Sequence, residues 1–268
     1  MKQPFRVDRW AAWAPGLETR QAWRDWLAAP APIPDEGQPP LAEVPAMMRR
    51  RIDPLGRAAL QVAWWAQGDA AGTMPVVFAS RWGEIARSLT LLQQLATEEP
   101  LSPTHFSLSV HNASGALYSM ARQDRQNYLA VAGGEHSAEA AFCEAIGLLA
   151  NGHPEVLVVH VDAPLPDAYA SLGQVPPASA DPALIAWACV LTLPDTASSS
   201  FTLEPLQADA LSPTASASPW LSGSLPVLAL LADADGGTGG ANRAWSLDRL
   251  IAGQPGGWRW TRQPAGTR

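Results

Sequence analysis

The fold of this chain is decided by one stretch, residues 129–146, which reads LAVAGGEHSAEAAFCEAI. Its first four residues are typical of a short buried strand, two glycines follow, and a helix is predicted over residues 137–151. Such a turn presents one side chain, Glu135 or His136, at the start of the helix, where free N–H groups and the helix dipole favour an anion. The stretch predicts either a site with an acidic tip or an ordinary helix start capped by Glu135 and Ser137.

Strands and helices alternate along the rest of the sequence. Further strands are predicted at residues 5–13, 75–80, 155–161, 185–193, 201–206 and 258–260. Further helices are predicted at residues 18–28, 55–67, 82–97, 113–123 and around 245–251. Asp53 is predicted to cap the second of these helices, and Pro54 fits its first turn. The segments 185–193 and 201–206 are predicted to form an antiparallel pair. This alternation predicts an α/β fold with layers of helices around a mixed sheet.

Two domain-level features follow from where proline and glycine lie. The proline-rich segments 29–45 and 163–182 are interpreted as surface connections. Residues 1–235 are predicted to form the domain. Residues 236–268 are predicted to be a Gly-rich C-terminal extension, either packed on the domain or flexible.

The composition excludes several classes of protein. Hydrophobic residues make up 47% of the chain and charged residues 16%, a balance opposite to that of disordered chains. A net charge of −7 argues against nucleic acid or an anionic membrane as the main partner. No apolar run reaches the length of a membrane span. Charged residues near the N-terminus argue against a signal peptide, and the well-separated Cys143 and Cys189 are typical of free thiols, so a cytoplasmic location is expected.

Two other readings of the decisive stretch involve its polar side chains. His136, Glu139 and Cys143 have the residue types of a metal site, but no second cluster of ligands accompanies them, so no metal is expected. Ser137 beside His136 suggests a catalytic triad, but adjacent residues seldom place a histidine to deprotonate the neighbouring serine.

Three segments resemble a known family. They are residues 44–57 (VPAMMRRRIDPLGR), 78–84 (FASRWGE) and 102–113 (SPTHFSLSVHNA), of which the last is the most specific. They resemble the N-terminal domain of β-ketoacyl synthases and, more closely, the short synthase-like proteins of aryl polyene pigment clusters. Those proteins are regarded as chain-length factors that pair with a complete ketosynthase. The resemblance extends over roughly residues 1–235.

The resemblance implies the N-terminal half of a thiolase-like layered sandwich, without a cofactor. Counted back without a gap from a predicted strand at Val156, Glu135 stands where a ketosynthase has its nucleophilic cysteine. Cys143 lies further along the helix and does not replace it. His153 and His160 do not match the two histidines of the C-terminal half of ketosynthases, and the sequence ends before such a half. The resemblance therefore implies a subunit without condensing activity of its own.

The resemblance also implies partners and a site. A chain-length factor forms a heterodimer with an active ketosynthase and shapes the tunnel for the growing chain. The predicted tunnel residues are Gly133, Gly134, Glu135 and Ala138, with the charge of Glu135 compensated by the positive end of the following helix. The predicted partner interface comprises Phe106, Leu108, Val110, His111, Asn112 and Leu117, whose apolar members would otherwise be partly exposed. An acyl carrier protein is expected at Arg49, Arg50 and Arg51, which otherwise form a solvated basic face.

Two other functions stay open at this point. The chain is alternatively a decarboxylase or acyltransferase that uses Glu135 as a base, although a carboxylate repels a malonate anion. It is alternatively a structural partner that stabilises the ketosynthase without any effect on chain length.

Overall fold

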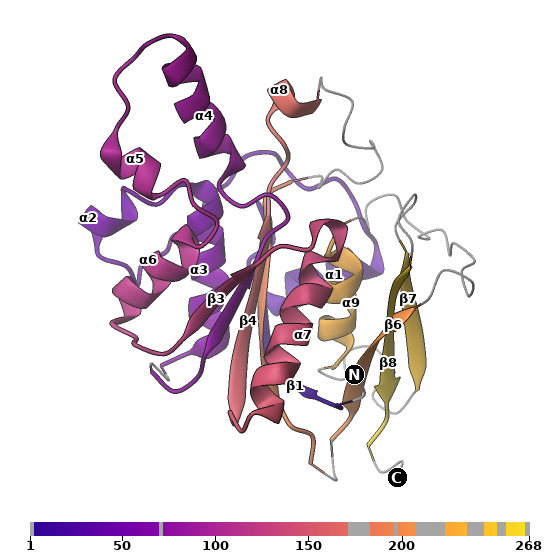
Figure 1. Cartoon of the computed structure of the whole chain (residues 1–268). Helices are drawn as coiled ribbons and strands as arrows, with labels where there is room; N and C mark the ends of the chain where they lie inside the picture. Colours follow the sequence, from indigo (N-terminus) through magenta and orange to yellow (C-terminus); the bar gives the residue numbers. More distant parts are fainter. Residues whose placement is uncertain are drawn as a thin grey trace.

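The computed structural model describes residues 3–69, 72–170, 183–195, 198–206, 223–234, 244–250 and 256–265. A five-stranded sheet has the order β1-β5-β4-β2-β3, and a three-stranded sheet has the order β6-β8-β7 (Figure 1). The strands of the first sheet are β1 (Arg6–Trp13), β2 (Val76–Ala79), β3 (Tyr128–Val131), β4 (Glu155–Asp162) and β5 (Ile185–Thr192). Those of the second sheet are β6 (Ser200–Leu206), β7 (Trp245–Leu250) and β8 (Gly257–Gln263).

Helices cover both faces of the five-stranded sheet. One face carries α3 (Pro54–Gln67) and α6 (Ala113–Arg122), and the other carries α7 (Ser137–Ala150), α9 (Leu225–Ala234) and α1 (Arg20–Ala28) (Figure 1). The shorter helices are α2 (Ala46–Arg49), α5 (Pro103–Ser107) and α8 (Asp167–Ala170), and α4 (Ile85–Ala96) lies at one end of the molecule. The three-stranded sheet packs outside α7, so the layers run helix, sheet, helix, sheet.

The strands build these layers because their side chains alternate between two cores. On β2, Val77 and Ala79 point to the core beneath α7, whereas Val76 and Phe78 point to the core beneath α3. A strand buried on both faces needs apolar residues at successive positions, and all four residues of β2 are buried. This arrangement confirms the prediction of an α/β fold with a mixed sheet.

Three parallel strands position the functional region. β2 pairs in parallel with both β3 and β4, whereas β5 is antiparallel to β4 and to β1. The carboxyl ends of parallel strands lie at one edge of a sheet, and ligands of open α/β sheets bind outside that edge. The loops that follow β2, β3 and β4 therefore meet there, and the predicted acidic turn is one of them.

Most predicted helices and strands are confirmed, with shifted ends. The prediction that residues 185–193 and 201–206 pair is wrong, since β5 lies between β1 and β4 and β6 pairs with β8. The strand β5 is buried along nearly its whole length and so belongs inside the larger sheet. Residues 129–132 were expected to be buried, but β3 is an edge strand and is half-buried.

The C-terminal part of the chain corrects one further prediction. A short helix was expected around residues 245–251, but Trp245 and Leu247 alternate with the polar Ser246 and Asp248, and the segment forms β7, which pairs with β8. Both strands come from the predicted extension and join β6 of the predicted domain, and Trp260 is buried in the core beneath α7.

The division of the chain at residue 235 stays a prediction, and the Gly-rich run at residues 235–240 lies outside the described residues. Among the described helices, none is long and apolar enough to cross a membrane.

Candidate functional site

The turn between β3 and α7 has the predicted strand–glycine–helix form. Gly134 has a φ of 59°, which favours glycine, and it opens a 3₁₀ turn over Gly134–His136. The Ser137 hydroxyl accepts a hydrogen bond from the N–H of Gly133 (3.0 Å) and donates one to the carbonyl of Gly134 (2.7 Å). These two hydrogen bonds of Ser137 stabilise the turn.

The carboxylate of Glu135 forms an ion pair with the guanidinium of Arg81, from the loop that follows β2. The two side chains are 12% and 9% exposed, so the pair is largely shielded from water. The Arg81 guanidinium also lies over the ring of Trp82, 4.6 Å from its centre. The sequence predicted compensation of the Glu135 charge by the helix end, but the structure provides a full counter-charge from another loop.

The end of β4 holds the loop that carries Arg81. Asp162 accepts hydrogen bonds from the Ser80 hydroxyl (2.9 Å) and from the backbone N–H of Arg81 (2.6 Å). The Ser80 hydroxyl in turn accepts from the N–H of Gly83 (2.8 Å). These bonds fix the backbone of Arg81, so its guanidinium is preorganised to meet Glu135.

His111 locks the same loop from the side of β3. Its Nε2 donates to the carbonyl of Val131, the last residue of β3 (3.0 Å). Gly83 has a φ of 55°, and a Cβ there would lie 2.5 Å from the Nδ1 of His111. Only glycine suits that position, and the histidine of the SVHN motif therefore joins the loops after β2 and β3.

A second ion pair lies behind the turn, beneath α7. The Glu139 side chain is fully buried, 3.1 Å from Arg249 of β7, and accepts from the indole N–H of Trp260 (3.1 Å). Burial by itself raises the pKa of Glu139, but Arg249, with His136 and Trp260, holds it below its usual value. Arg249 also donates to the carbonyl of Glu135 (3.1 Å), so this pair supports the turn.

The histidines that the sequence singled out have separate places. His160 is buried on β4, stacks flat on Trp187 at 4.9 Å, and lies 3.4 Å from Asp162. Burial, with the Arg249 charge, lowers the pKa of His160 to about 3, so its imidazole is neutral. His153 lies in the connection between α7 and β4.

The predicted interface residues divide into exposed and buried groups. Phe106 is 67% exposed and Val110 47% exposed, and Leu108 is half-buried. Asn112 is exposed at the start of α6. The expectation that Leu117 is partly exposed is wrong, because α6 turns Leu117 into the core against the sheet.

The predicted tunnel and carrier-protein residues are placed as follows. Gly133 and Gly134 are exposed at the turn, and Ala138 is buried in the core beneath α7. Of the basic triplet, the guanidinium of Arg49 donates to the carbonyl of Leu41 (3.0 Å), whereas its two neighbours are exposed. The tunnel, the partner interface and the carrier contact stay predictions.

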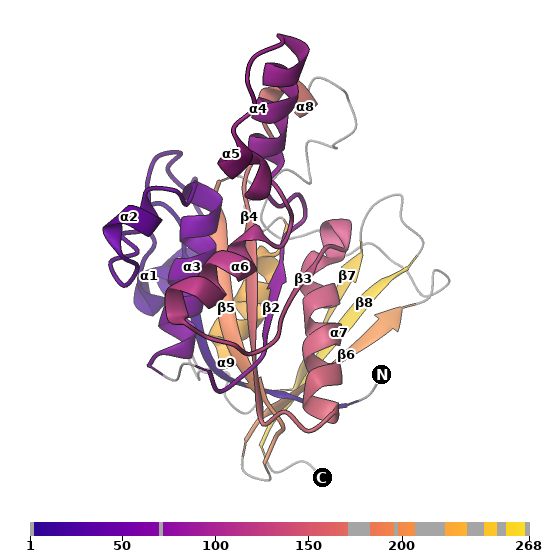
Figure 2. The same cartoon turned by 60° about the vertical axis from the view of Figure 1, so that its left-hand side comes forward.

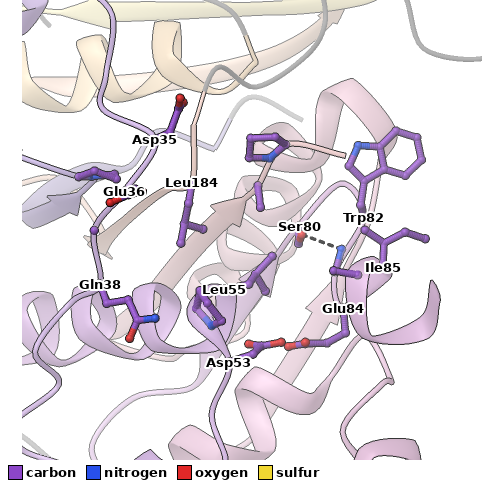
Figure 3. Close-up of a pocket in the computed structure, with 17 residues that line it drawn as sticks. Asp35, Glu36, Gln38, Asp53, Leu55, Ser80, Trp82, Glu84, Ile85 and Leu184 are labelled. Atoms are coloured by element: carbon purple, nitrogen blue, oxygen red, sulfur yellow. Dashed lines mark hydrogen bonds between the residues drawn. The ribbon is translucent and has the colours of Figure 1, made fainter. Parts of the chain in front are cut away.

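A carboxyl pair beside a cavity is the feature that sequence reasoning missed. A cavity of about 470 Å³ opens near the loop after β2, and Asp53 and Glu84 face each other in its wall (Figure 3). Burial, and then Asp53, raise the pKa of Glu84 to about 9. Burial alone raises the pKa of Asp53, but Glu84, the N–H of Gly56 and Arg87 together lower it.

The sequence identified Asp53 as the cap of α3, and this is confirmed, since its carboxylate accepts from the N–H of Gly56 (2.8 Å). The available signal for Glu84 was an acidic residue between the apolar strand at 76–79 and an apolar helix. The two carboxyls are far apart in sequence, so their contact had no local signal.

The comparisons with known proteins agree with this geometry. The β-ketoacyl synthase N-terminal domain family matches residues 23–246. No curated protein matches the chain. The chain is similar to one in the complex of a ketosynthase with its chain length factor from Xenorhabdus doucetiae, at 25% identity and a TM-score of 0.73, over 97% of this chain and 100% of that one.

Two other solved structures show the same fold at lower identity. The ishigamide ketosynthase/chain length factor matches at 15% identity and a TM-score of 0.74, over 98% of this chain and 99% of that one. A β-ketoacyl synthase from Burkholderia phymatum matches at 15% identity and a TM-score of 0.54, over 79% of this chain and 66% of that one. Because the family match covers most of the sequence and agrees with the layered fold, this chain belongs to the β-ketoacyl synthase N-terminal domain family.

Proposed function

We propose that this chain is a catalytically silent ketosynthase-like subunit, a chain-length factor, that pairs with an active β-ketoacyl-carrier-protein synthase in aryl polyene or polyketide elongation. The observation that carries the proposal is the Glu135–Arg81 ion pair, at the turn where the family resemblance puts the nucleophilic cysteine. Condensation needs a thiolate to accept the acyl group. A carboxylate held by a guanidinium is a poor nucleophile, and the anhydride it would form hydrolyses in water.

The same ion pair weighs against the alternative of a decarboxylase or acyltransferase that uses Glu135. A general base needs a free lone pair within reach of the substrate. Here the carboxylate of Glu135 is paired with the guanidinium of Arg81. The loop that carries Arg81 is fixed by the hydrogen bonds that Asp162 accepts from Ser80 and from the backbone of Arg81. The geometry therefore supports a filled nucleophile position better than a second chemistry at that position.

Three observations support pairing with a ketosynthase. The similar Xenorhabdus structure is a ketosynthase in complex with its chain length factor, and the matched chain is covered completely. Among the described strands, β3 pairs with β2 alone, which leaves backbone groups on its other side for a partner. Leu92, Leu95 and Phe106, on α4 and α5, are all more than half exposed.

The proposal includes a carrier-protein contact and a cellular location. Arg50 and Arg51 are exposed and can meet an acidic carrier protein. The free thiols Cys143 and Cys189 fit a reducing cytoplasm.

Intact-protein mass spectrometry tests the silent site. The purified chain is incubated with an acyl-carrier thioester, with a ketosynthase as the positive control. We expect an acyl adduct on the ketosynthase and none on this chain. We also expect this chain to release free acid from the thioester no faster than buffer alone does. An adduct on this chain, or acid release that disappears in Glu135→Ala, would show that Glu135 reacts and would contradict the proposal.

A further inference from the structure

Helix α4 and helix α5 form an arm that stands out from the body in both views (Figures 1 and 2). Among the described elements, α4 has its main contacts with α5, and Leu91 is the one residue of α4 that is buried. A helix that buries so little apolar surface is not oriented by core packing. Its direction is therefore determined where it joins the body, at its N-terminal turn.

Three charged side chains meet at that join. Asp53 caps α3, Glu84 precedes α4, and Arg87 lies in the first turn of α4. The Arg87 guanidinium is 3.1 Å from one oxygen of Asp53 and 3.6 Å from Oε2 of Glu84. The Glu84 side chain is 3% exposed and the Arg87 side chain 14% exposed. The cluster thus ties the start of α4 to the start of α3.

The geometry of the cluster favours a proton between the two carboxyl groups. The Oε2 atom of Glu84 is buried and has no hydrogen-bond partner among the described residues, and the Nε of Arg87, which also lacks one, is 3.6 Å away. The two carboxyl groups of Asp53 and Glu84 face each other (Figure 3). The Asp53 side chain is 24% exposed and that of Glu84 is buried, and two carboxylates in such contact repel unless they share one proton. One proton and the charge of Arg87 make the cluster neutral, which suits its burial.

We propose that Asp53, Glu84 and Arg87 form a proton-sharing clamp that orients the α4–α5 arm on the body. Under the proposed function, which this last step rests on, the clamp positions the exposed side chains of the arm for the ketosynthase. The shared proton acts as a link between two helix starts, with Glu84 as donor and Asp53 as acceptor. Glu84 is a positioning residue and touches no reacting group.

Other charged groups face the clamp from the elements around it. Asp35 and Glu36, from the segment before α2, line the same cavity. His111, from the segment before α6, lines a smaller cavity that Glu84 also reaches. Asp35 and Glu36 are exposed, so the burial of Glu84 and its contact with Asp53, rather than these neighbours, raise the pKa of Glu84 to about 9. The clamp is therefore closed at neutral pH and loses its proton in alkaline solution.

Hydrogen–deuterium exchange of α4 in the isolated chain tests the clamp, without any partner. Exchange rates are divided by the intrinsic rates at about pH 7 and about pH 10, where a group with a pKa near 9 is about 90% ionised. Wild type should lose about tenfold protection in α4 at the higher pH, in proportion to this ionisation. Glu84→Gln, whose amide donates where the proton lies, should keep its protection at both values. Glu84→Ala should lack it at both, and Glu99→Gln, an exposed control beyond α4, should behave as wild type.

Two results would overturn the proposal. One is α4 protection in Glu84→Ala equal to that of wild type at neutral pH, because the clamp would then not orient the arm. The other is the absence, in wild type, of a glutamate carboxyl ¹³C resonance that titrates near pH 9 and vanishes in Glu84→Gln. Both measurements use the chain alone, so a failure to pair with a ketosynthase leaves their outcome unaffected.

Discussion

At the scale of single residues, the turn before α7 carries an ion pair that is largely shielded from water. Glu135 lies at the tip of the turn, and Arg81 reaches it from a loop held by Asp162 and His111 through different bonds. Neither charge is exposed enough for water to screen it fully. Each charge is therefore compensated mainly by the other side chain rather than by water.

The first prediction concerns this dependence. Arg81→Ala leaves Glu135 buried without its counter-charge and should lower the free energy of unfolding by about 3 kcal/mol or more. The double variant Arg81→Ala with Glu135→Ala should recover part of that loss. Denaturant unfolding measures both, with the exposed Arg50→Ala as the matched control. If Arg81→Ala lowers the free energy of unfolding no more than Arg50→Ala does, the ion pair does not stabilise the fold.

The second prediction is a pH dependence that comes from Glu84. Its pKa is raised from 4.5 to about 9, so between these values the folded chain binds a proton that the unfolded chain has released. Stability from this group is complete below about pH 4.5 and falls as the pH rises, by up to ~1.4 kcal/mol per unit, until the folded pKa is passed. Glu84→Gln should remove this slope in urea unfolding measured across the range. Parallel curves for the two proteins would contradict the raised pKa.

At the scale of elements, local sequence patterns predicted the elements better than their partners. The Asp53-Pro54 signal located the start of α3, and the two glycines located the turn before α7. The pairing of β5 and β6 was wrong because sequence neighbours need not be sheet neighbours. The polar partners of Glu135 and Glu139 come from distant loops and strands, and no local pattern identifies them.

The third prediction tests how the second sheet holds α7. Trp260 of β8 is 1% exposed, lies 4.7 Å from the ring centre of Phe142, and donates to Glu139. Trp260→Ala should lower the free energy of unfolding by about 3–5 kcal/mol, because it leaves a cavity and an unpaired acceptor. Trp258→Ala, on the same strand and only half-buried, is the control. A loss of less than about 1 kcal/mol for Trp260→Ala would contradict the prediction and would show that β8 does not unfold together with α7.

The fourth prediction concerns the arm. Leu92 is 55% exposed and Phe106 is 67% exposed, so aspartate at both positions should leave the fold intact. The double variant should weaken binding to the ketosynthase at least tenfold, because burying two new charges in an apolar interface is costly. Leu193→Asp, at a leucine after β5 that is 47% exposed, serves as the control. Unchanged affinity by native mass spectrometry would place the interface elsewhere.

At the scale of the whole molecule, the observed layers of helices and sheets agree with the family to which the chain belongs. The helix–sheet–helix arrangement and the turn before α7 are those expected from the resemblance to ketosynthases, and the family match confirms it. The sequence also located Glu135 at the tip, because the turn is local. The ion pair of Glu135 with Arg81 and the cluster at the start of α4 depend on how distant loops fold together. Those contacts became visible only in three dimensions.

Mass spectrometry of carrier-bound products tests the central claim most directly. Three reactions with acyl- and malonyl-carrier are compared: this chain alone, a full-length ketosynthase from the same genome alone, and the two together. A silent chain-length factor predicts no condensation product from this chain alone, and longer products of defined length from the pair than from the ketosynthase alone. A β-ketoacyl product from this chain alone, or a product distribution that its addition leaves unchanged, would contradict the account.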